Sequence, residues 1–491
     1  MRPGKWKWLG ILISFSLPGF VIAGGLLSLS GEAVSLAHVG QEFLAAQTLH
    51  VVQLTLLATA VALGASWVLA LPLALFFRMR NSTVLRLGVL LPGIAYALVV
   101  LWALRFFGVQ ELYSLHSVML AWILAGTLYL ASGWVSLLRD LDPRQNEMLR
   151  VLGAGPIRAF VLHEFLRSWP GQLQLLLQQA WFCFTSFSLV LILNGGPPNE
   201  TLEVAIYSAL RLGGGSIERA VALTLWQTLL LLALKGIMQS LSGLSFRGGD
   251  RGHPTGEWAI STGAPCGRKG LRSNPRLLVT VFAAGVIGVG VWGGAFSAFR
   301  GPLMNSLALG ASVTSVCLLF CISCYFSGFR SLAEAASWTS PMILSFLVWR
   351  QWNGMLLPWV NLILLQALLF APGFSRGVFP VLSRFRRQEW EIAQVLGASP
   401  FRAWIEVEWP RVRGPVFRAL GMVFSLSFME VTSVLLLSRG DFETLSSHVQ
   451  DLFLRFRIDE AAIGTVLLAS IVLLTQVLSE EDMQGSRGSR A

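Results

Sequence analysis

Side chains that could carry out chemistry are sparse in this sequence, and they are scattered along the chain. The 491 residues include six His and five Cys, but no HExxH and no paired Cys and His spacing of a zinc site. A G-x-x-x-x-G-K-[ST] phosphate-binding loop is also missing from the sequence. Cys317, Cys321 and Cys324 share one face of an apolar stretch and are expected to be small buried residues. We therefore expect no catalytic residue, no bound metal and no cofactor.

One acidic residue stands out within an apolar run. Glu430 lies in the segment SLSFMEVTSVLLL. A charge at the centre of a membrane helix costs about 2.5 to 3.5 kcal/mol on insertion scales, so such residues usually face a cavity or a partner. The sequence thus predicts a place for Glu430 in a solute pathway. A structural pair with another helix, or a position near the membrane surface, remains open.

The composition explains why such a residue is unusual here. Hydrophobic residues make up 54% of the chain and charged residues only 13%, whereas about a quarter is usual for charged residues in soluble proteins. The apolar residues form runs of roughly 17 to 25, which is the length of helix that crosses a bilayer. The sequence predicts an all-α integral membrane protein with about 12 transmembrane helices. The predicted spans are 9–29, 48–77, 84–104, 115–138, 173–193, 219–242, 277–298, 304–327, 332–349, 355–375, 415–437 and 461–478.

The net charge of +11 is explained by the positions of Lys and Arg along the chain, without a nucleic acid partner. Most of them fall in the basic N-terminus and in the loops 139–167, 243–276 and 376–413, while residues 30–47 contain neither. Because cytoplasmic loops of membrane proteins are enriched in Lys and Arg, these loops and both termini are predicted to be cytoplasmic. The first apolar run is expected to be a retained signal anchor.

A repeat at an offset of 244 divides the chain into two halves. The segment EMLRVLGAGPIRAFVLHEFL from Glu147 aligns without gaps with EIAQVLGASPFRAWIEVEWP from Glu391. Downstream, Glu-Thr-Leu recurs at Glu200 and Glu443. Both copies follow the fourth span of a half, so we expect two parallel six-helix repeats with a pathway at their interface. The predicted parts are a first half 1–242, a cytoplasmic linker 243–276, a second half 277–478 and a cytoplasmic tail 479–491.

The comparison of halves adds two pathway candidates. The region of the first half that corresponds to Glu430 holds Ser186 and Ser188 but no acid, so we expect the two halves to contribute unequally. Asn194 precedes Gly195, Gly196, Pro197 and Pro198 and is predicted to end a helix near the translocation gate. The candidate pathway residues are Glu430, Ser188 and Asn194.

Each copy of the repeated block predicts a helix-turn-helix elbow outside the membrane. A short helix is expected to end at Gly153 or Gly397, since glycine suits the left-handed cap of a helix. Pro156 and Pro400 follow three residues later, and Arg158 and Arg402 lie on the next helix. One such elbow could be an amphipathic hairpin at the membrane surface without a partner. Two copies at equivalent positions favour a surface for a partner protein.

The spacing within this block resembles the docking loop of permease subunits of ATP-binding cassette importers. The first copy departs from the pattern at Leu149, His163 and Leu166, so the two loops are not expected to contribute equally. Single chains with two such halves are similar to ferric-iron and thiamine permeases. The second copy carries the pattern at Glu391, Ala393, Gly397, Val407, Trp409 and Pro410.

The resemblance implies a type I importer-like permease in the bacterial inner membrane, with docking loops at 140–170 and 383–413. A separate dimeric ATPase would bind these loops from the cytoplasm, and an extracytoplasmic solute-binding protein would deliver ferric iron or a thiamine-like solute. The two glycines would act sterically, because a Cβ would disturb the turn. The residues implied in coupling are Glu147, Gly153, Pro156, Arg158, Glu391, Gly397, Pro400 and Arg402.

Two other classes of protein remain as alternatives. An ion-driven secondary transporter would also have parallel halves, but it should carry several acids in its core helices, where this sequence offers chiefly Glu430. Uptake that survives ATP depletion would favour such a transporter. A membrane-embedded enzyme would need catalytic side chains in a cluster, whereas the six histidines of this sequence are scattered.

Overall fold

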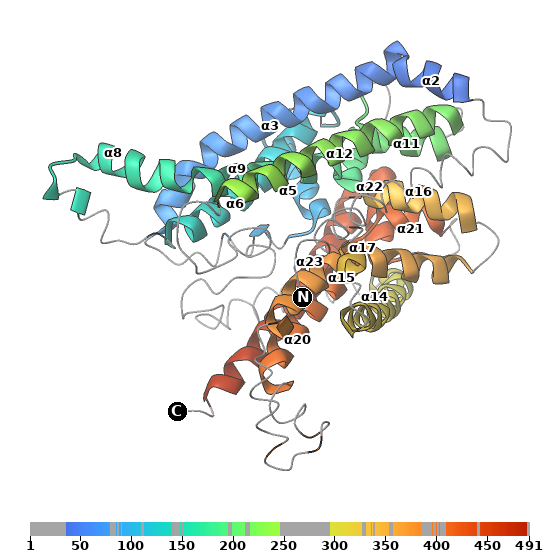
Figure 1. The fold of residues 1–491 in the computed structure, drawn as a ribbon. Helices are drawn as coiled ribbons and strands as arrows, with labels where there is room; N and C mark the ends of the chain where they lie inside the picture. Colours follow the sequence, from blue (N-terminus) through green and yellow to red (C-terminus); the bar gives the residue numbers. More distant parts are fainter. Residues whose placement is uncertain are drawn as a thin grey trace. The chain divides into compact units, whose positions relative to one another are not determined.

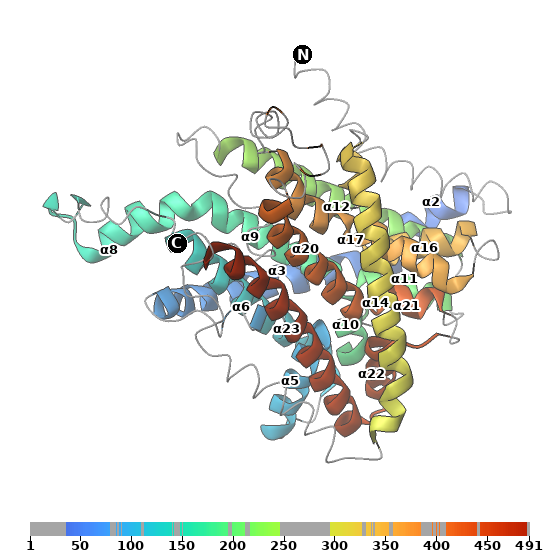
Figure 2. The same ribbon diagram turned by 90° about the horizontal axis from the view of Figure 1, so that it is seen from below.

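The computed structural model describes a set of helices that fall into two compact units, residues 36–245 and residues 295–488 (Figures 1 and 2). Every regular element in the described part of the chain is a helix. The residues described are 36–78, 85, 88–89, 91–109, 112–139, 141, 148–149, 151–194, 199–211, 217–245, 295–326, 330–334, 336, 339–352, 357–383, 395, 399, 402, 409–438 and 442–488.

The first unit is built around two long helices, α3 and α6, which pack along each other. Its core contains Ala70 and Ala74 of α3 against Leu130, Ala131 and Trp134 of α6. Small residues on one helix face allow close approach of the partner helix within a membrane. The helices are α2 Leu36–Leu44, α3 Ala46–Arg78, α5 Gly93–Phe106, α6 Leu115–Arg139, α8 Pro156–Ala159, η1 Phe160–Phe165, α9 Leu166–Phe184, α10 Phe187–Asn194, α11 Leu202–Arg211 and α12 Ile217–Ser245.

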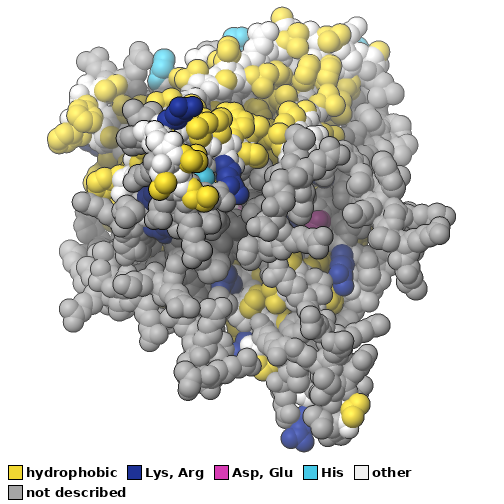
Figure 3. All heavy atoms as spheres, turned by 60° about the vertical axis from the view of Figure 1, so that its left-hand side comes forward, with side chains coloured by type: hydrophobic (Ala, Val, Ile, Leu, Met, Phe, Trp, Pro, Cys, Tyr) yellow, Lys and Arg dark blue, Asp and Glu magenta, His cyan; other side chains and the backbone are white. Residues whose placement is uncertain are grey.

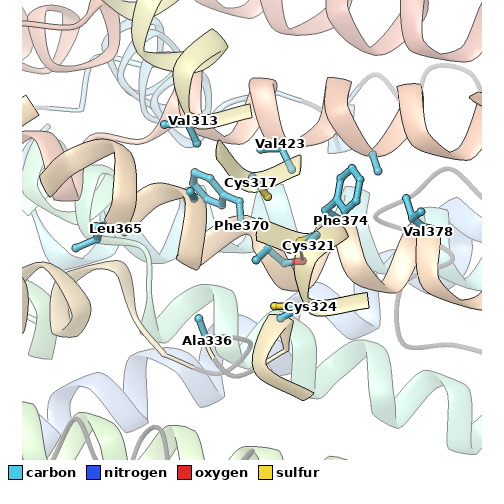
Figure 4. Close-up of a cluster of buried hydrophobic side chains, with 14 of the residues drawn as sticks. Val313, Cys317, Cys321, Cys324, Ala336, Leu365, Phe370, Phe374, Val378 and Val423 are labelled. Atoms are coloured by element: carbon cyan, nitrogen blue, oxygen red, sulfur yellow. Dashed lines mark hydrogen bonds between the residues drawn. The ribbon is translucent and has the colours of Figure 1, made fainter. Parts of the chain in front are cut away.

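The second unit has its core between α14, α17 and α20. Cys317 and Cys321 of α14 are fully buried beside Phe370 and Phe374 of α17 and Val423 of α20 (Figure 4). The expectation that these cysteines are small buried residues is confirmed. The helices are α14 Ala295–Phe326, α15 Arg330–Ala333, α16 Pro341–Trp352, α17 Pro358–Ser383, α20 Trp409–Met429, α21 Thr432–Leu437, α22 Leu445–Leu454 and α23 Ile458–Gly488.

Six helices in the described part of the chain are long and apolar enough to cross a membrane, and a bent pair could form a seventh span. The bent pair is Phe160–Phe184 with Phe187–Leu193, which meet at 57°. On α3, large apolar side chains such as Leu57 and Val68 are more than half exposed, as expected for a surface that faces lipid. On the face drawn in Figure 3, apolar side chains cover much of the surface that belongs to described residues. The protein is thus a multi-pass membrane protein.

The dozen spans expected from the sequence are not confirmed. The span 9–29 lies outside the described residues, and 277–298 overlaps them only where α14 begins. Three expected spans are interrupted, because backbone breaks separate α9 from α10, α15 from α16 and α20 from α21. Pro341 begins α16, in agreement with the preference of proline for the first turn of a helix. In the expected span 84–104, helix α5 begins at Gly93, and Leu85, Gly88 and Val89 before it are also helical.

The repeated Glu-Thr-Leu sequence occupies similar positions in both units. The backbone N–H of Leu202, which begins α11, donates to Thr55 Oγ1 of α3 at 3.2 Å. The N–H of Leu445, which begins α22, donates to Ser306 Oγ of α14 at 2.7 Å. The first N–H groups of a helix have no partner inside it, so a hydroxyl from a neighbouring helix satisfies one of them in each unit.

Replacement of Gly464 by alanine is expected to destabilise the second unit. A Cβ at this position of α23 would come within 2.5 Å of Val449 Cγ2 and 2.8 Å of Phe299 Cε1, and both side chains are buried. Overpacking of this kind costs about 1 to 3 kcal/mol. Thermal unfolding of the detergent-purified protein, followed by tryptophan fluorescence, would show a lowered midpoint. In the control Gly236→Ala the new Cβ meets nothing within 4 Å, so an equal loss there would contradict the packing argument.

Candidate functional site

The elbow predicted in the first half has its left-handed turn. Gly153 has a φ of +82°. The N–H of Ala154 donates to the carbonyl of Leu149 at 3.0 Å, and the N–H of Leu152 donates to that of Met148 at 3.0 Å. A bond from the residue after the glycine back across six residues is the signature of a Schellman cap. The cap expected at Gly153 is therefore confirmed.

The expectation that a Cβ would disturb this turn is supported by the backbone conformation of Gly153 and not by its neighbours. An added Cβ at Gly153 would meet no atom within 4 Å. The requirement comes from the backbone instead, because a left-handed conformation costs an L-residue with a side chain roughly 1 to 2 kcal/mol. The turn thus excludes most side chains by conformation while leaving open space around it.

The tip of the elbow exposes apolar side chains. Met148, Val151 and Leu152 are 65%, 87% and 80% exposed. Val395, which occupies the position of Val151 in the second copy, is 88% exposed. Exposed apolar residues next to a rigid cap mark an interaction surface, either with a protein or with a membrane. Arg158 on α8 is also exposed, close to this tip.

A helical arm connects this tip with the rest of the first unit. The arm consists of α8, η1 and α9, with α8 at its free end (Figures 1 and 2). At its root, Phe165 of η1 and Trp169 of α9 pack against Trp67 of α3, with ring centroids 6.1 and 6.3 Å from that of Trp67. The ring centroid of Trp134 of α6 also lies 6.1 Å from that of Trp67. The arm therefore rests on α3 and α6 through aromatic contacts.

Several of the predicted coupling residues lie outside the described residues. This holds for Glu147, Glu391, Gly397 and Pro400. Pro156 begins α8, as expected for a proline at a helix start. Arg402 is helical and exposed, like Arg158 in the first copy. The structure leaves the coupling role of all eight residues as a prediction.

The expectation that Glu430 lies in the middle of a helix is wrong. It lies with Val431 in a two-residue break between α20 and α21, and it is half-buried. Its Oε1 accepts a hydrogen bond from the N–H of Ser433 at 3.1 Å, and its carbonyl accepts one from Ser446 Oγ at 3.1 Å. A break between two helices leaves backbone groups that must find partners elsewhere. Glu430 supplies one such partner through its carboxylate.

The first unit has a matching break with neutral residues. Thr185 and Ser186 separate α9 from α10, as Glu430 and Val431 separate α20 from α21. Ser186 Oγ accepts a hydrogen bond from Trp122 Nε1 of α6 at 2.7 Å. Ser188 is the second residue of α10 and is half-buried. Asn194 is the last residue of α10, in agreement with the predicted helix end.

A buried amide near the second break was missed from the sequence. Gln366 of α17 donates from Nε2 to Ser433 Oγ at 3.0 Å and accepts from Ser427 Oγ at 2.7 Å. This network ties α17 to both sides of the Glu430 break. No motif marks Gln366, but a glutamine in an apolar run is a signal of the same kind as Glu430, because a polar group in the membrane requires a partner.

Two more polar residues were missed at the root of the arm. Arg78, the last residue of α3, forms an ion pair with Glu164 of η1, with 2.6 Å between Nη1 and Oε2. Glu164 is one of the residues that the two copies of the repeated block share, since Glu408 stands at the same position. This identity was the available signal.

The long apolar helices define a class of protein, the multi-pass membrane proteins. Similar curated proteins support this class. The thiamine transport system permease protein ThiP of Brucella abortus is 26% identical over 370 residues, which cover 68% of this chain and 65% of that protein. The protein of the same name from Brucella melitensis is 25% identical over 352 residues, covering 65% and 62%. The chain thus matches less than two thirds of the length of these relatives.

The resemblance to importer permeases that the docking-loop residues indicated is confirmed by these names. A further relative with that name, from Brucella suis, is 25% identical over 370 residues. No protein-family model matches the chain. No solved structure matches it either.

Proposed function

We propose that the chain is the permease subunit of an ATP-binding cassette importer and that its two elbows bind a separate ATPase. The observation that carries this proposal is the rigid elbow with an exposed apolar tip, whose sequence recurs once at a spacing of 244 residues. Lipid alone would not require two elbows at equivalent positions of the chain. A dimeric ATPase, in contrast, presents two equivalent surfaces, one to each elbow.

The proposal includes two parallel halves. Several features of the two units support this arrangement. The α9–α10 and α20–α21 breaks each contain two residues, and α11 and α22 both contain ten. The hydroxyl contacts to Leu202 and Leu445 are also alike. We place the boundaries at 1–242, 243–276, 277–478 and 479–491, with about 12 spans by analogy with the repeated order of helices.

We also propose the orientation and the partners. With Arg78, Arg139 and the elbows at the cytoplasmic surface, both termini are cytoplasmic, in accordance with the positive-inside rule. The protein would lie in a bacterial inner membrane. An extracytoplasmic solute-binding protein would deliver the solute on the opposite side.

A thiamine-like solute is the best-supported substrate, because the similar proteins carry thiamine in their names. Ferric iron has only the resemblance of the docking loop in its favour. The solute would pass beside the breaks in the α9–α10 and α20–α21 pairs, since irregular backbone at membrane depth is tolerated where it is buried or lines a cavity. Glu430 and Ser188 are the pathway residues proposed at these breaks, and Asn194 lies at the end of α10.

The test is uptake of labelled thiamine into vesicles that contain the full chain with the ATPase and the binding protein encoded beside it. We expect uptake to require ATP inside the vesicle, and we expect thiamine with its binding protein to stimulate hydrolysis of that ATP. Uptake that continues without ATP and collapses with an uncoupler would show an ion-driven transporter instead. Labelled ferric iron in place of thiamine would test the second substrate under the same conditions.

A further inference from the structure

An ion pair joins the root of the arm to the carboxyl end of α3. Arg78 Nη1 lies 2.6 Å from Glu164 Oε2, a distance typical of a charge-assisted hydrogen bond. The side chain of Glu164 is 4% exposed and that of Arg78 is 30% exposed. A buried carboxylate that loses its cation is strongly destabilised. The position of the arm root is therefore linked to the end of α3.

Local backbone geometry directs Glu164 toward Arg78. Residues Phe160–Phe165 form a π-helical stretch between the α-helices α8 and α9. A π turn contains one additional residue, which rotates the following side chains by about 100° relative to an uninterrupted α-helix. The Glu164 carbonyl is held by Ser168 Oγ at 2.5 Å, and Gln172 Nε2 donates to Ser168 Oγ at 2.6 Å. Side chains of α9 thus stabilise the π-helical stretch in the orientation that places the Glu164 carboxylate beside Arg78.

A second arginine connects α6 to the same point. Arg139, the last residue of α6, donates from Nη2 to the carbonyls of Phe77 and Arg78 at 3.5 and 3.4 Å. The last carbonyls of a helix have no partner inside it and carry partial negative charge, so they attract a guanidinium. The carboxyl ends of α3 and α6 and the arm root therefore meet in one charged cluster, defined by Arg78, Arg139 and Glu164.

The aromatic contacts of the arm root differ from the ion pair in what they restrict. Phe165 and Trp169 against Trp67 keep the arm on α3, but apolar packing has no direction and permits small sliding motions. An ion pair of 2.6 Å has a direction and a narrow range of distances. It is suited to fix the register of the arm relative to α3.

We infer that Arg78 and Glu164 are positioning residues that transmit displacement of the elbow to α3. The inference rests on the proposed function, in which an ATPase moves the elbow. With the pair intact, a movement of the tip carries the end of α3 with it. Without the pair, the arm slides on its aromatic contacts and ATP hydrolysis no longer drives uptake. Glu408 keeps the same residue type at the equivalent position of the second copy.

The test is a charge exchange in the assembled complex of permease, ATPase and binding protein. Arg78→Glu and Glu164→Arg are made singly and together, with Glu164→Gln as a neutral variant of the same shape. We expect the ATPase to co-purify with every variant, because the tip is unchanged. Each single variant should lower thiamine uptake per hydrolysed ATP at least tenfold, and the double exchange should restore a substantial part of it.

The control is the exposed pair Arg455 and Asp451 of the second unit, with 2.8 Å between Nε and Oδ2, whose exchange should leave uptake per ATP unchanged. If single variants lose folded protein but retain wild-type uptake per ATP, the pair is only structural and the inference is overturned. The inference is also overturned if the double exchange does not restore thiamine uptake per hydrolysed ATP while the Glu164→Gln variant keeps the wild-type value. If wild-type uptake itself needs no ATP, the proposed function fails instead, whatever the variants do.

Discussion

Replacement of Gly397 by valine is expected to reduce ATP-driven uptake at least tenfold while the protein still inserts into the membrane. Gly397 occupies the position of Gly153 in the second copy of the repeated block, and Gly153 has a φ of +82°. A left-handed conformation costs a residue with a side chain about 1 to 2 kcal/mol, and a β-branched residue tolerates it least. Because 1.4 kcal/mol corresponds to a factor of ten, an elbow strained in this way would be displaced from its partner most of the time.

The matched control is Gly397→Asn, since asparagine enters the left-handed region more readily than other residues with a side chain. Uptake and co-purification of the ATPase are measured for both variants. We expect asparagine to retain most of the uptake. Equal losses with valine and asparagine would indicate that any side chain at Gly397 collides with a neighbouring group. Full activity of the valine variant would refute the docking role of the second elbow.

The same exchange at Gly153 is expected to have a smaller effect on uptake. The first copy lacks the resemblance at Leu149, His163 and Leu166, so its elbow should contribute less to the interaction with the ATPase. Gly153→Val and Gly397→Val are compared in parallel uptake assays at equal amounts of folded protein. A larger loss at Gly153 would reverse the proposed order of the two loops.

Replacement of Glu430 by glutamine is expected to reduce uptake of a cationic solute such as thiamine at least tenfold, with little change in thermal stability. Glutamine keeps an oxygen that can accept the hydrogen bond from the N–H of Ser433, now 3.1 Å from Glu430 Oε1, but it removes the negative charge. A half-buried carboxylate beside the proposed pathway would attract a positive solute. The pathway role depends on that charge, and the capping role does not.

Glu430→Ala separates the two roles, because alanine removes both the charge and the acceptor. Loss of such a cap costs about 1 kcal/mol, so the unfolding midpoint should fall for alanine and not for glutamine. Uptake is then compared per amount of folded protein. Wild-type uptake with glutamine and lowered stability with alanine would show that Glu430 only caps α21.

Hydrophobic patterning accounted for the long helices, and one motif accounted for the elbow. The expected spans 48–77, 115–138 and 219–242 each fall within one helix, α3, α6 and α12, because a membrane selects uninterrupted apolar stretches of sufficient length. The cap at Gly153 followed from local rules on glycine and proline. Such features depend on neighbours within a few residues, so the sequence by itself determined them.

The breaks and the polar contacts between distant residues were decided by the tertiary structure. The sequence is apolar on both sides of Glu430, so hydrophobic patterning does not show that the helix ends there. The polar groups at the break find hydrogen-bond partners in Gln366, Ser433 and Ser446, which only the folded chain brings together. The pairing of Arg78 with Glu164 joins residues 86 positions apart. Only the packing of the arm against α3 and the π-helical turn bring their charges together, and a buried charge takes the partner that packing places beside it.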